Sequence, residues 1–354
     1  MKISIDCRMA GASGIGVYLR GCLPFFLSSP DDFLLIGSKK ELNPFGEGRT
    51  NVNIIDCAVK TFSFKELFFF PPAILKVVNQ TDLYYSPFFN IPGGITVPVY
   101  TTIHDIIFPD MPELTSKAGL VVRMFFYRRA VKKSKKIFTV SIFSKSRIEY
   151  HLGKTKPVIV THSALQPFLQ KLTTGKKNDT IIFIGNIKKH KGLSVLLEAF
   201  LDARKEGVPY TLIIVGGKDN FRSQDRDMTE KIEAADENAV KFTGYIGDEE
   251  LKNLLAGASL LVQPSFYEGF GLPPLEAMCL GTRALISDIP VFREIYAGFP
   301  VTFFRAGDAV DLKNKMLTLL TDKKNHRPLV LPDHLRNKYT FKKTASIIMD
   351  ELTT

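Results

Sequence analysis

Residues 264–281 read Pro-Ser-Phe-Tyr-Glu-Gly-Phe-Gly-Leu-Pro-Pro-Leu-Glu-Ala-Met-Cys-Leu-Gly, and they follow the apolar run 258–263. An apolar strand, a glycine turn and then a helical pattern are typical of one βα unit in a parallel sheet. Such a turn gathers backbone N–H groups and the positive end of a helix dipole, an arrangement that suits a phosphate. Glu268 and Glu276 stand eight positions apart around the turn, and Glu276 is expected to face back toward whatever the turn holds. There its carboxylate would accept hydrogen bonds from sugar hydroxyls.

Short β-rich runs alternate with helical patterns along the whole chain, which is typical of parallel sheets with crossover helices. We expect strands at 2–6, 32–36, 52–56, 82–85, 97–103, 136–140, 157–161, 180–185, 210–215, 240–243, 258–263 and 283–287. We expect helices at 14–27, 66–78, 115–133, 142–151, 192–205, 228–235, 248–256, 272–280, 309–321 and 341–353.

The length of 354 residues and a restart of the alternation after residue 179 predict two doubly wound α/β domains. The expected parts are a first domain over 1–165, a linker over 166–179, a second domain over 180–335 and a final helical segment over 336–354. Ligands of such sheets bind beyond the carboxyl ends of the strands. We therefore expect the chemistry in loops that follow strands, on a cleft shared by the two domains.

The net charge of +11 is concentrated in the first half of the chain. Residues 1–165 hold 21 lysines and arginines against 12 acidic residues, whereas the remainder holds 26 against 24. The segments 60–72 and 123–136 combine lysine or arginine with phenylalanine, a pattern typical of nucleic-acid or anionic membrane surfaces. Because no nucleic-acid motif accompanies them, an anionic membrane surface is the better prediction. The alternative is a solvated helix face beside an aromatic core.

Several features predict a cytoplasmic protein without a resident metal or cofactor. No apolar run reaches the roughly 18 residues that a membrane span needs, and the chain opens as a strand rather than a signal peptide. The four cysteines have neither metal-ligand nor disulfide spacing. No Asp-x-Asp motif ends a strand, and no histidine–cysteine cluster is present.

The pair Glu268 and Glu276 resembles the Glu-x7-Glu signature of retaining glycosyltransferases of the large family four. This resemblance implies the GT-B fold: two Rossmann-like domains that face a central cleft, and a C-terminal helix that crosses back to the first domain. It also implies that Glu276 binds the nucleotide ribose and that Glu268, a catalytic candidate, lies beside the transferred sugar. The amides implied to hold the donor diphosphate are those of Gly269, Phe270, Gly271 and Leu272.

The run 185–192, Gly-Asn-Ile-Lys-Lys-His-Lys-Gly, resembles the Gly-Arg/Asn-x4-Lys-Gly motif of the same family. The resemblance implies, by position, that Lys191 is the diphosphate-binding lysine, and lysine can neutralise a diphosphate leaving group. Asn186 stands where many members have arginine, so the source of a second positive charge stays open. The candidates for it are Lys188, Lys189 and His190. The alternative is an exposed, lysine-rich helix start.

Two loops of the first half are further candidates. His104 and Asp105 end an apolar strand, and a His-Asp-apolar run with a nearby proline recurs in the family. The resemblance implies that the histidine lies near the primary hydroxyl of the sugar, where it hydrogen-bonds or aids acceptor activation. Gly14 and Gly16 follow the first strand without completing a G-x-G-x-x-G fingerprint. They resemble the first-strand loop whose glycines approach the donor.

The loop Gly244, Tyr245 and Ile246 follows an expected strand of the second half, and such loops usually contact the nucleotide base through backbone groups in this family. Arg8 and Arg293 are lesser candidates for phosphate or acceptor contacts. Ser141 is expected to cap the helix that follows it.

The resemblance implies hexosyl transfer with retention from a nucleotide-diphosphate sugar, with no metal, by front-face attack. The opening Gly185-Asn186 and the run 287–294 are most similar to bacterial enzymes of O-antigen or capsule assembly. They favour GDP-mannose as donor and a glycan or lipid-linked oligosaccharide as acceptor, with dTDP-rhamnose, UDP-glucose and GDP-fucose as alternative donors. Two other classes stay open: a nucleotide-sugar epimerase of the same fold, and a non-catalytic sugar-nucleotide-binding partner of an assembly complex.

Overall fold

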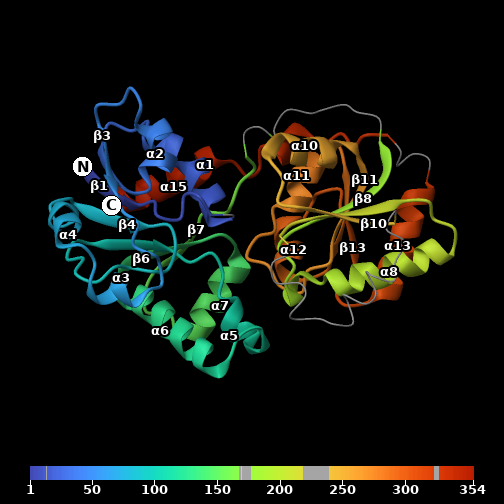
Figure 1. The fold of residues 1–354 in the computed structure, drawn as a ribbon, viewed down its shortest axis with the longest axis horizontal. Helices are drawn as coiled ribbons and strands as arrows, with labels where there is room; N and C mark the ends of the chain where they lie inside the picture. Colours follow the sequence, from blue (N-terminus) through green and yellow to red (C-terminus); the bar gives the residue numbers. More distant parts are fainter. Residues whose placement is uncertain (13, 167–168, 170–176, 218–238, 323–326) are drawn as a thin grey trace. The chain divides into compact units, whose positions relative to one another are not determined.

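The computed structural model describes the chain except for residues 13, 167–168, 170–176, 218–238 and 323–326. The chain divides into two compact units (Figure 1), one formed by Met1–Gln166 with Tyr339–Thr354 and the other by Pro167–Lys338. The helix expected at 228–235 and most of the linker expected at 166–179 lie outside the described residues.

The first unit is built on a parallel sheet of seven strands in the order β3-β2-β1-β4-β5-β6-β7. Its strands are β1 (Lys2–Asp6), β2 (Asp32–Gly37), β3 (Val52–Asp56), β4 (Leu83–Ser86), β5 (Val99–Thr102), β6 (Ser134–Thr139) and β7 (Val158–Val160). Each lies where the sequence predicted a strand. β1, β4 and β5 are almost wholly buried, as central strands of a parallel sheet covered on both faces must be.

The α-helices between residues 1 and 166 are α1 (Ile15–Phe26), α2 (Lys39–Gly46), α3 (Phe64–Phe68), α4 (Pro72–Val78), α5 (Ile107–Asp110), α6 (Lys117–Lys133) and α7 (Ile142–Leu152). Two of them, α3 and α4, were expected as one helix. The single helix predicted at 66–78 is wrong. Pro71 is extended and Pro72 opens α4, because proline cannot continue a helix but fits the first position of a new one. Neither α2 nor α5 was predicted.

The second unit repeats the architecture with a parallel sheet in the order β10-β9-β8-β11-β12-β13. Its strands are β8 (Asn178–Ile184), β9 (Thr211–Val215), β10 (Val240–Gly244), β11 (Ala258–Gln263), β12 (Arg283–Ser287) and β13 (Thr302–Phe304). Its helices include α8 (Leu193–Lys205), α10 (Asp248–Gly257), α11 (Pro273–Cys279), α12 (Pro290–Ile295), α13 (Ala309–Thr321) and α14 (Asp333–Arg336). Five strands were predicted. The three-residue β13 and the short helices α12 and α14 were missed.

Helices cover both faces of this second sheet, because successive strand residues point to opposite sides and both sides are apolar. Phe183 and Val262 belong to the core formed with α8 and α13. On the other side, α10 contacts β8, and α11 contacts β11.

The last helix, α15 (Phe341–Thr353), packs on α1 of the first unit, which confirms the predicted return of the chain. A Cβ atom on Gly21 would overlap the ring of Phe341, so the missing side chain in α1 makes room for that ring. Lys136 Nζ also donates to Glu351 Oε2 at 2.8 Å. No described helix combines the length and the apolar character that a membrane crossing requires.

Candidate functional site

The second sheet brings two of the predicted loops together at its topological switch point. β8 and β11 are neighbours, and the strand order runs in opposite directions on either side of them. Loops that leave such a pair at their carboxyl ends go to opposite faces and open a binding crevice. The run 185–192 follows β8, and the turn 264–272 follows β11. Residues 191 and 268, which are far apart in the sequence, therefore lie close together.

Lys191 and Glu268 form an ion pair at this point. Lys191 Nζ donates to Glu268 Oε1 at 2.7 Å and to Oε2 at 2.8 Å. The same carboxylate accepts from Ser265 Oγ at 2.8 Å, and Gln263 Nε2 donates to Ser265 Oγ at 3.1 Å. Ser265 and Gln263 are fully buried and were not predicted. A glutamine that ends an apolar strand was the available signal. The three side chains fix the orientation of the Glu268 carboxylate.

Backbone contacts hold the two loops in register. The Phe266 N–H donates to the carbonyl oxygen of His190 at 2.8 Å. Gly192 has a φ of 66°, and a Cβ atom there would overlap the carbonyl oxygen of Pro264. Both the left-handed conformation and the close approach require glycine at this position. The backbone thus holds the two loops at the separation at which Lys191 can pair with Glu268.

In the lysine-rich loop 185–192, Lys191 is paired with Glu268, whereas other polar side chains face solvent. Asn186, Lys188 and Lys189 are exposed. Burial, followed by the charge of Lys191, lowers the pKa of His190 to about 4. His190 is therefore neutral at pH 7, which leaves Lys188 and Lys189 as the candidates for a second positive charge.

The turn before α11 presents fewer helix-terminal donors than the sequence suggested. α11 has seven residues, and its first two positions are Pro273 and Pro274, which carry no N–H. Among the described residues, no acceptor pairs with the amides of Gly271 or Leu272. The carbonyl oxygen of Gly271 accepts from Tyr296, whose hydroxyl accepts in turn from the Leu275 N–H at 3.2 Å. The available donors therefore belong to the turn rather than to the helix.

Glu276 is a buried carboxyl group in the first turn of α11. Burial, followed by the charge of Asp248, raises its pKa to about 7. Asp248 is the first residue of α10 and directly follows the loop that contains Gly244, Tyr245 and Ile246. The side chain of Tyr245 is almost fully exposed. Glu276 and the predicted base-contacting loop thus lie in one neighbourhood.

In the first unit, His104 follows β5 and is neutral. One of its ring nitrogens, Nε2, lies 2.8 Å from the carbonyl oxygen of Pro87. Because a carbonyl only accepts, Nε2 carries the proton and Nδ1 is left as an acceptor. Burial lowers the pKa of His104 to about 4. The neighbouring Asp105 accepts from the Ile107 N–H at 3.2 Å at the start of α5, so one of its carboxylate oxygens has a local structural partner.

The loop after β1 approaches the same histidine. Gly14 begins α1 with a φ of 65°, and a Cβ atom on Gly16 would overlap the carbonyl oxygen of Ala10. One turn into the helix, the ring of Tyr18 meets His104 edge-on, with 4.8 Å between the ring centroids. The structure therefore brings the first-strand loop and His104 together within the first unit.

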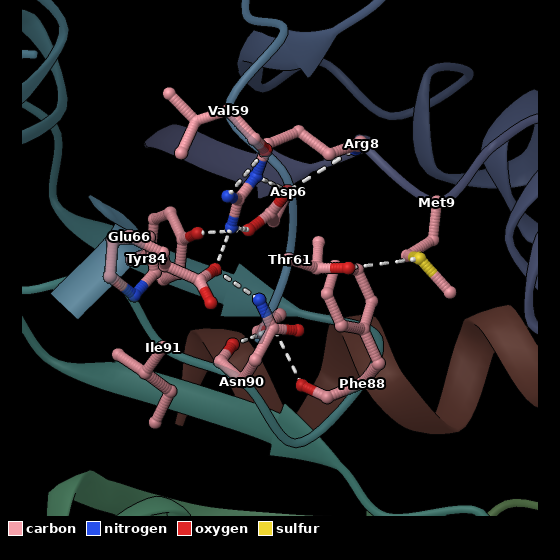
Figure 2. Close-up of polar contacts among 12 residues, drawn as sticks. Asp6, Arg8, Met9, Val59, Thr61, Glu66, Tyr84, Phe88, Asn90 and Ile91 are labelled. Carbon is pink, nitrogen blue, oxygen red and sulfur yellow. Dashed lines mark hydrogen bonds and ion pairs between the residues drawn. The ribbon is translucent and has the colours of Figure 1, made fainter. Parts of the chain in front are cut away.

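Arg8 is not available for a phosphate. Its guanidinium donates to Asp6 and Glu66 in a buried cluster (Figure 2). Arg293 pairs weakly with Asp288 at 3.8 Å and lies over the ring of Phe303. Ser141 caps α7 by accepting from the Ser144 N–H at 3.0 Å, as predicted. Within the described ranges, no three histidine, cysteine, aspartate or glutamate side chains gather as a metal site.

Residues 166–330 match the family model described as glycosyl transferases group 1. Residues 166–330, which lie almost wholly in the second unit, belong to this family. The matched segment contains both loops of the switch point and the Glu268–Glu276 pair.

Curated relatives of the chain include two O-antigen chain mannosyltransferases. The chain is 33% identical over 201 residues to the O-antigen chain mannosyltransferase RfbU of Salmonella typhimurium, covering 55% of this chain and 53% of the relative. It is 30% identical over 229 residues to the O-antigen chain mannosyltransferase B of Escherichia coli, covering 60% of this chain and 58% of the relative. The chain thus spans little more than half the length of these curated relatives.

Solved structures extend the likeness to the whole chain. The crystal structure of Anabaena HepE in complex with UDP-glucose superposes with a TM-score of 0.74 at 18% identity, covering 100% of this chain and 99% of that one. Sucrose-phosphate synthase from Thermosynechococcus elongatus gives 0.71 at 16% identity, covering 100% and 98%. With two parallel Rossmann-like sheets and α15 returned to α1, the chain has the GT-B fold.

Proposed function

We propose that the chain is a retaining glycosyltransferase that moves a hexose, with mannose as the first choice, from a nucleotide-diphosphate sugar to a glycan or lipid-linked oligosaccharide acceptor. The reaction would serve the cytoplasmic assembly of a bacterial surface polysaccharide. The observation that carries the proposal is the Lys191–Glu268 pair at the switch point, oriented by Ser265. Glu276 lies eight residues beyond Glu268 on the same loop and helix.

The donor diphosphate would lie between Lys191 and the turn. An ammonium group has three donors, and two of those of Lys191 are directed at Glu268. The third is left for a phosphate oxygen, as are the amides of Gly271 and Leu272. Fixed donors around a leaving group stabilise the charge that develops as it departs. This arrangement supports diphosphate departure without a metal.

The two glutamates would serve opposite ends of the donor. Because its pKa is about 7, the Glu276 carboxyl can either accept from or donate to ribose hydroxyls near neutral pH. The loop 244–246 lies in the same neighbourhood and would contact the base. Glu268 is held by Lys191 and Ser265, so it would act on the sugar by hydrogen bonding and charge, not as a covalent nucleophile.

In the proposed reaction, an acceptor hydroxyl attacks the anomeric carbon on the face from which the diphosphate departs. The bond between acceptor oxygen and carbon forms as the carbon–phosphate-oxygen bond breaks, and the departing phosphate oxygen takes the hydroxyl proton. His104 would accept a sugar hydroxyl hydrogen bond at Nδ1. A neutral imidazole with Nε2–H committed to Pro87 suits positioning better than acid catalysis. Asp105 would help to place that histidine.

Two curated relatives are named as O-antigen chain mannosyltransferases, which favours GDP-mannose over the alternative donors dTDP-rhamnose, UDP-glucose and GDP-fucose. HepE was crystallised with UDP-glucose, so that donor is the first to compare.

The test is nucleotide diphosphate release from each donor, with and without a polyprenyl-linked oligosaccharide. Acceptor-dependent release from GDP-mannose is expected. If only another donor releases its nucleotide diphosphate, the mannosyl assignment is wrong. Formation of a free or epimerised sugar in the absence of acceptor would indicate an epimerase. Binding without release would indicate the non-catalytic partner. Glu268→Ala should abolish turnover, whereas Lys205→Ala, at an exposed surface pair with Asp202, should not change it.

A further inference from the structure

Three phenylalanines at α3 are displayed to solvent. The exposed fractions of Phe64, Phe68 and Phe69 are 70%, 63% and 66%. The Phe64 ring lies 4.5 Å from that of Phe68 and 6.3 Å from that of Phe69, so the three form one patch. Removing such side chains from water is favourable in proportion to the apolar area that they expose. A contiguous exposed patch of this kind marks an interaction surface.

The segment that leads into α3 packs on α6. Phe62 contacts Phe126 of α6 with 5.5 Å between ring centroids, and Phe125 contacts Phe126 at 5.6 Å. Figure 1 shows α3 and α6 on the same side of the first unit. We name as the aromatic face the exposed apolar residues of the two helices and the residue after α3. These are Phe64, Phe68, Phe69, Val121, Val122 and Phe125.

Within α6 and the segment around α3, the exposed charged residues are all basic. The seventeen residues of α6 include no acidic residue and six basic ones. Beside the phenylalanines, Lys60 and Lys65 are exposed, whereas Glu66 is buried. Lysine and arginine side chains are attracted to an anionic leaflet. Aromatic side chains ringed by basic ones fit an anionic bilayer interface.

A buried cluster of polar side chains, shown in Figure 2, anchors the inner side of α3. Glu66, on the inner side of α3, accepts from Arg8 Nη2 at 2.6 Å, and Arg8 Nη2 also lies 2.5 Å from Asp6 Oδ2 at the end of β1. The second Glu66 oxygen accepts from the Phe62 N–H at 2.7 Å, and Asn90 donates to the first. Because these bonds orient α3, its outward side chains cannot turn inward without breaking them.

We propose that the aromatic face inserts its phenylalanines into the interface of an anionic lipid bilayer, while the surrounding lysines and arginines contact the headgroups. The preformed geometry means that insertion requires no folding of the segment. The proposal deepens the proposed function, because a chain bound to the membrane can reach a lipid-linked acceptor. Only this biological role of the binding rests on the proposed function. The binding itself is measurable without turnover.

The test is flotation of the full chain with phosphatidylcholine vesicles that contain or lack phosphatidylglycerol. We expect binding to the anionic vesicles only. Replacing all three phenylalanines, F64S/F68S/F69S, should lower the partition coefficient at least about tenfold, because the apolar surface that enters the interface is lost. The matched control is V310S/V330S, which removes exposed apolar side chains from the second unit and should float like the parent chain. K132E/K133E should weaken binding and its salt dependence.

Unchanged flotation of the triple variant, or no flotation of the parent chain, would overturn the proposal. So would a parent dimer, seen by sedimentation equilibrium, that the triple variant loses while neither binds vesicles, because the face would then join two copies. Circular dichroism checks that the triple variant is folded. Donor turnover with a water-soluble acceptor should survive in the triple variant. If the parent chain floats but shows no donor turnover, the proposed function is wrong, whereas the proposal of membrane binding by the aromatic face still holds.

Discussion

Each unit carries an ion pair at the carboxyl end of a central strand, and the two pairs differ in whether the cation keeps a donor without a partner in the described part of the chain. The Arg8 and Glu66 side chains are 2% and 0% exposed, and Arg8 also serves Asp6 and the Val59 carbonyl. The Lys191 and Glu268 side chains are 20% and 10% exposed, and Lys191 has one partner among the described residues. A charge at a strand end is therefore not itself a binding site. It becomes one when a donor remains uncommitted and reachable.

The largest effect is expected from breaking the closed cluster. Arg8→Met leaves the carboxylates of Asp6 and Glu66 buried without their cation, which should lower the free energy of unfolding by about 3–5 kcal/mol. Urea unfolding monitored by circular dichroism measures the loss. The control is Arg293→Met, whose partly exposed pair should contribute less than about 1 kcal/mol. A loss below that of the control would show that the cluster is not structural.

The open pair should respond in activity rather than in stability. Lys191→Ala should lower kcat about 10²–10³-fold, the range found when one fixed donor to a developing oxyanion is removed. The folded state should tolerate the change, because Ser265 still donates to Glu268 and the site is partly open to water. Steady-state kinetics with the active donor measure the loss, and Lys205→Ala serves as control. An unchanged kcat would remove Lys191 from the phosphate site.

Glu276 sharpens the comparison through pH. The folded-state pKa of about 7 exceeds the ordinary value of 4.5, so the folded chain holds the proton more tightly. The stability that the neutral carboxyl contributes is fully present below pH 4.5 and is lost as pH rises through 7. Glu276→Gln should therefore raise the free energy of unfolding at pH 8 by up to about 3 kcal/mol, and much less at pH 5, while weakening donor binding.

Urea unfolding at the two pH values and calorimetric titration with the donor test this expectation. The same stability difference at pH 5 and pH 8 would mean that the Glu276 carboxyl does not titrate between them. Undiminished donor affinity would separate Glu276 from the ribose.

His104 should give the smallest effect, which is no titration across the physiological range. Because burial lowers its pKa to about 4, its ring should stay neutral between pH 5.5 and pH 8. An NMR pH titration of the imidazole signals measures this, and the His104→Asn variant assigns the signal. A midpoint above 6 would restore His104 as a proton donor.

The sequence predicts most strands because a buried parallel strand is a nearly continuous apolar run, as in β8 and β11. It fails for β13, whose three residues are too few to form a pattern. Pro71 and Pro72 mark the break between α3 and α4, although the apolar periodicity continues across it. The tautomer of His104 depends on Pro87, seventeen residues away, and no spacing rule indicates it.

The candidate site divides in the same way. Glu268, Glu276 and Lys191 stand out as charged residues in glycine-rich loops after strands. That Lys191 meets Glu268 follows from the adjacency of β8 and β11, which is a property of the sheet order and not of either loop. Arg8 has the same local appearance as a phosphate ligand, yet Glu66 and Tyr84 reach its cluster from distant segments. Local sequence identifies candidates, and topology decides between them.

The position of α15 bears on the order in which the chain acquires its structure during translation. Residues 339–354 complete the first unit, yet the ribosome makes them only after all of residues 167–338. Until then, the surface of α1 around Gly21 has no Phe341 ring to cover it. The nascent first unit therefore leaves this part of α1 uncovered while the second unit is synthesised. A chaperone that binds the chain at that stage is expected to contact the surface of α1 that α15 later covers.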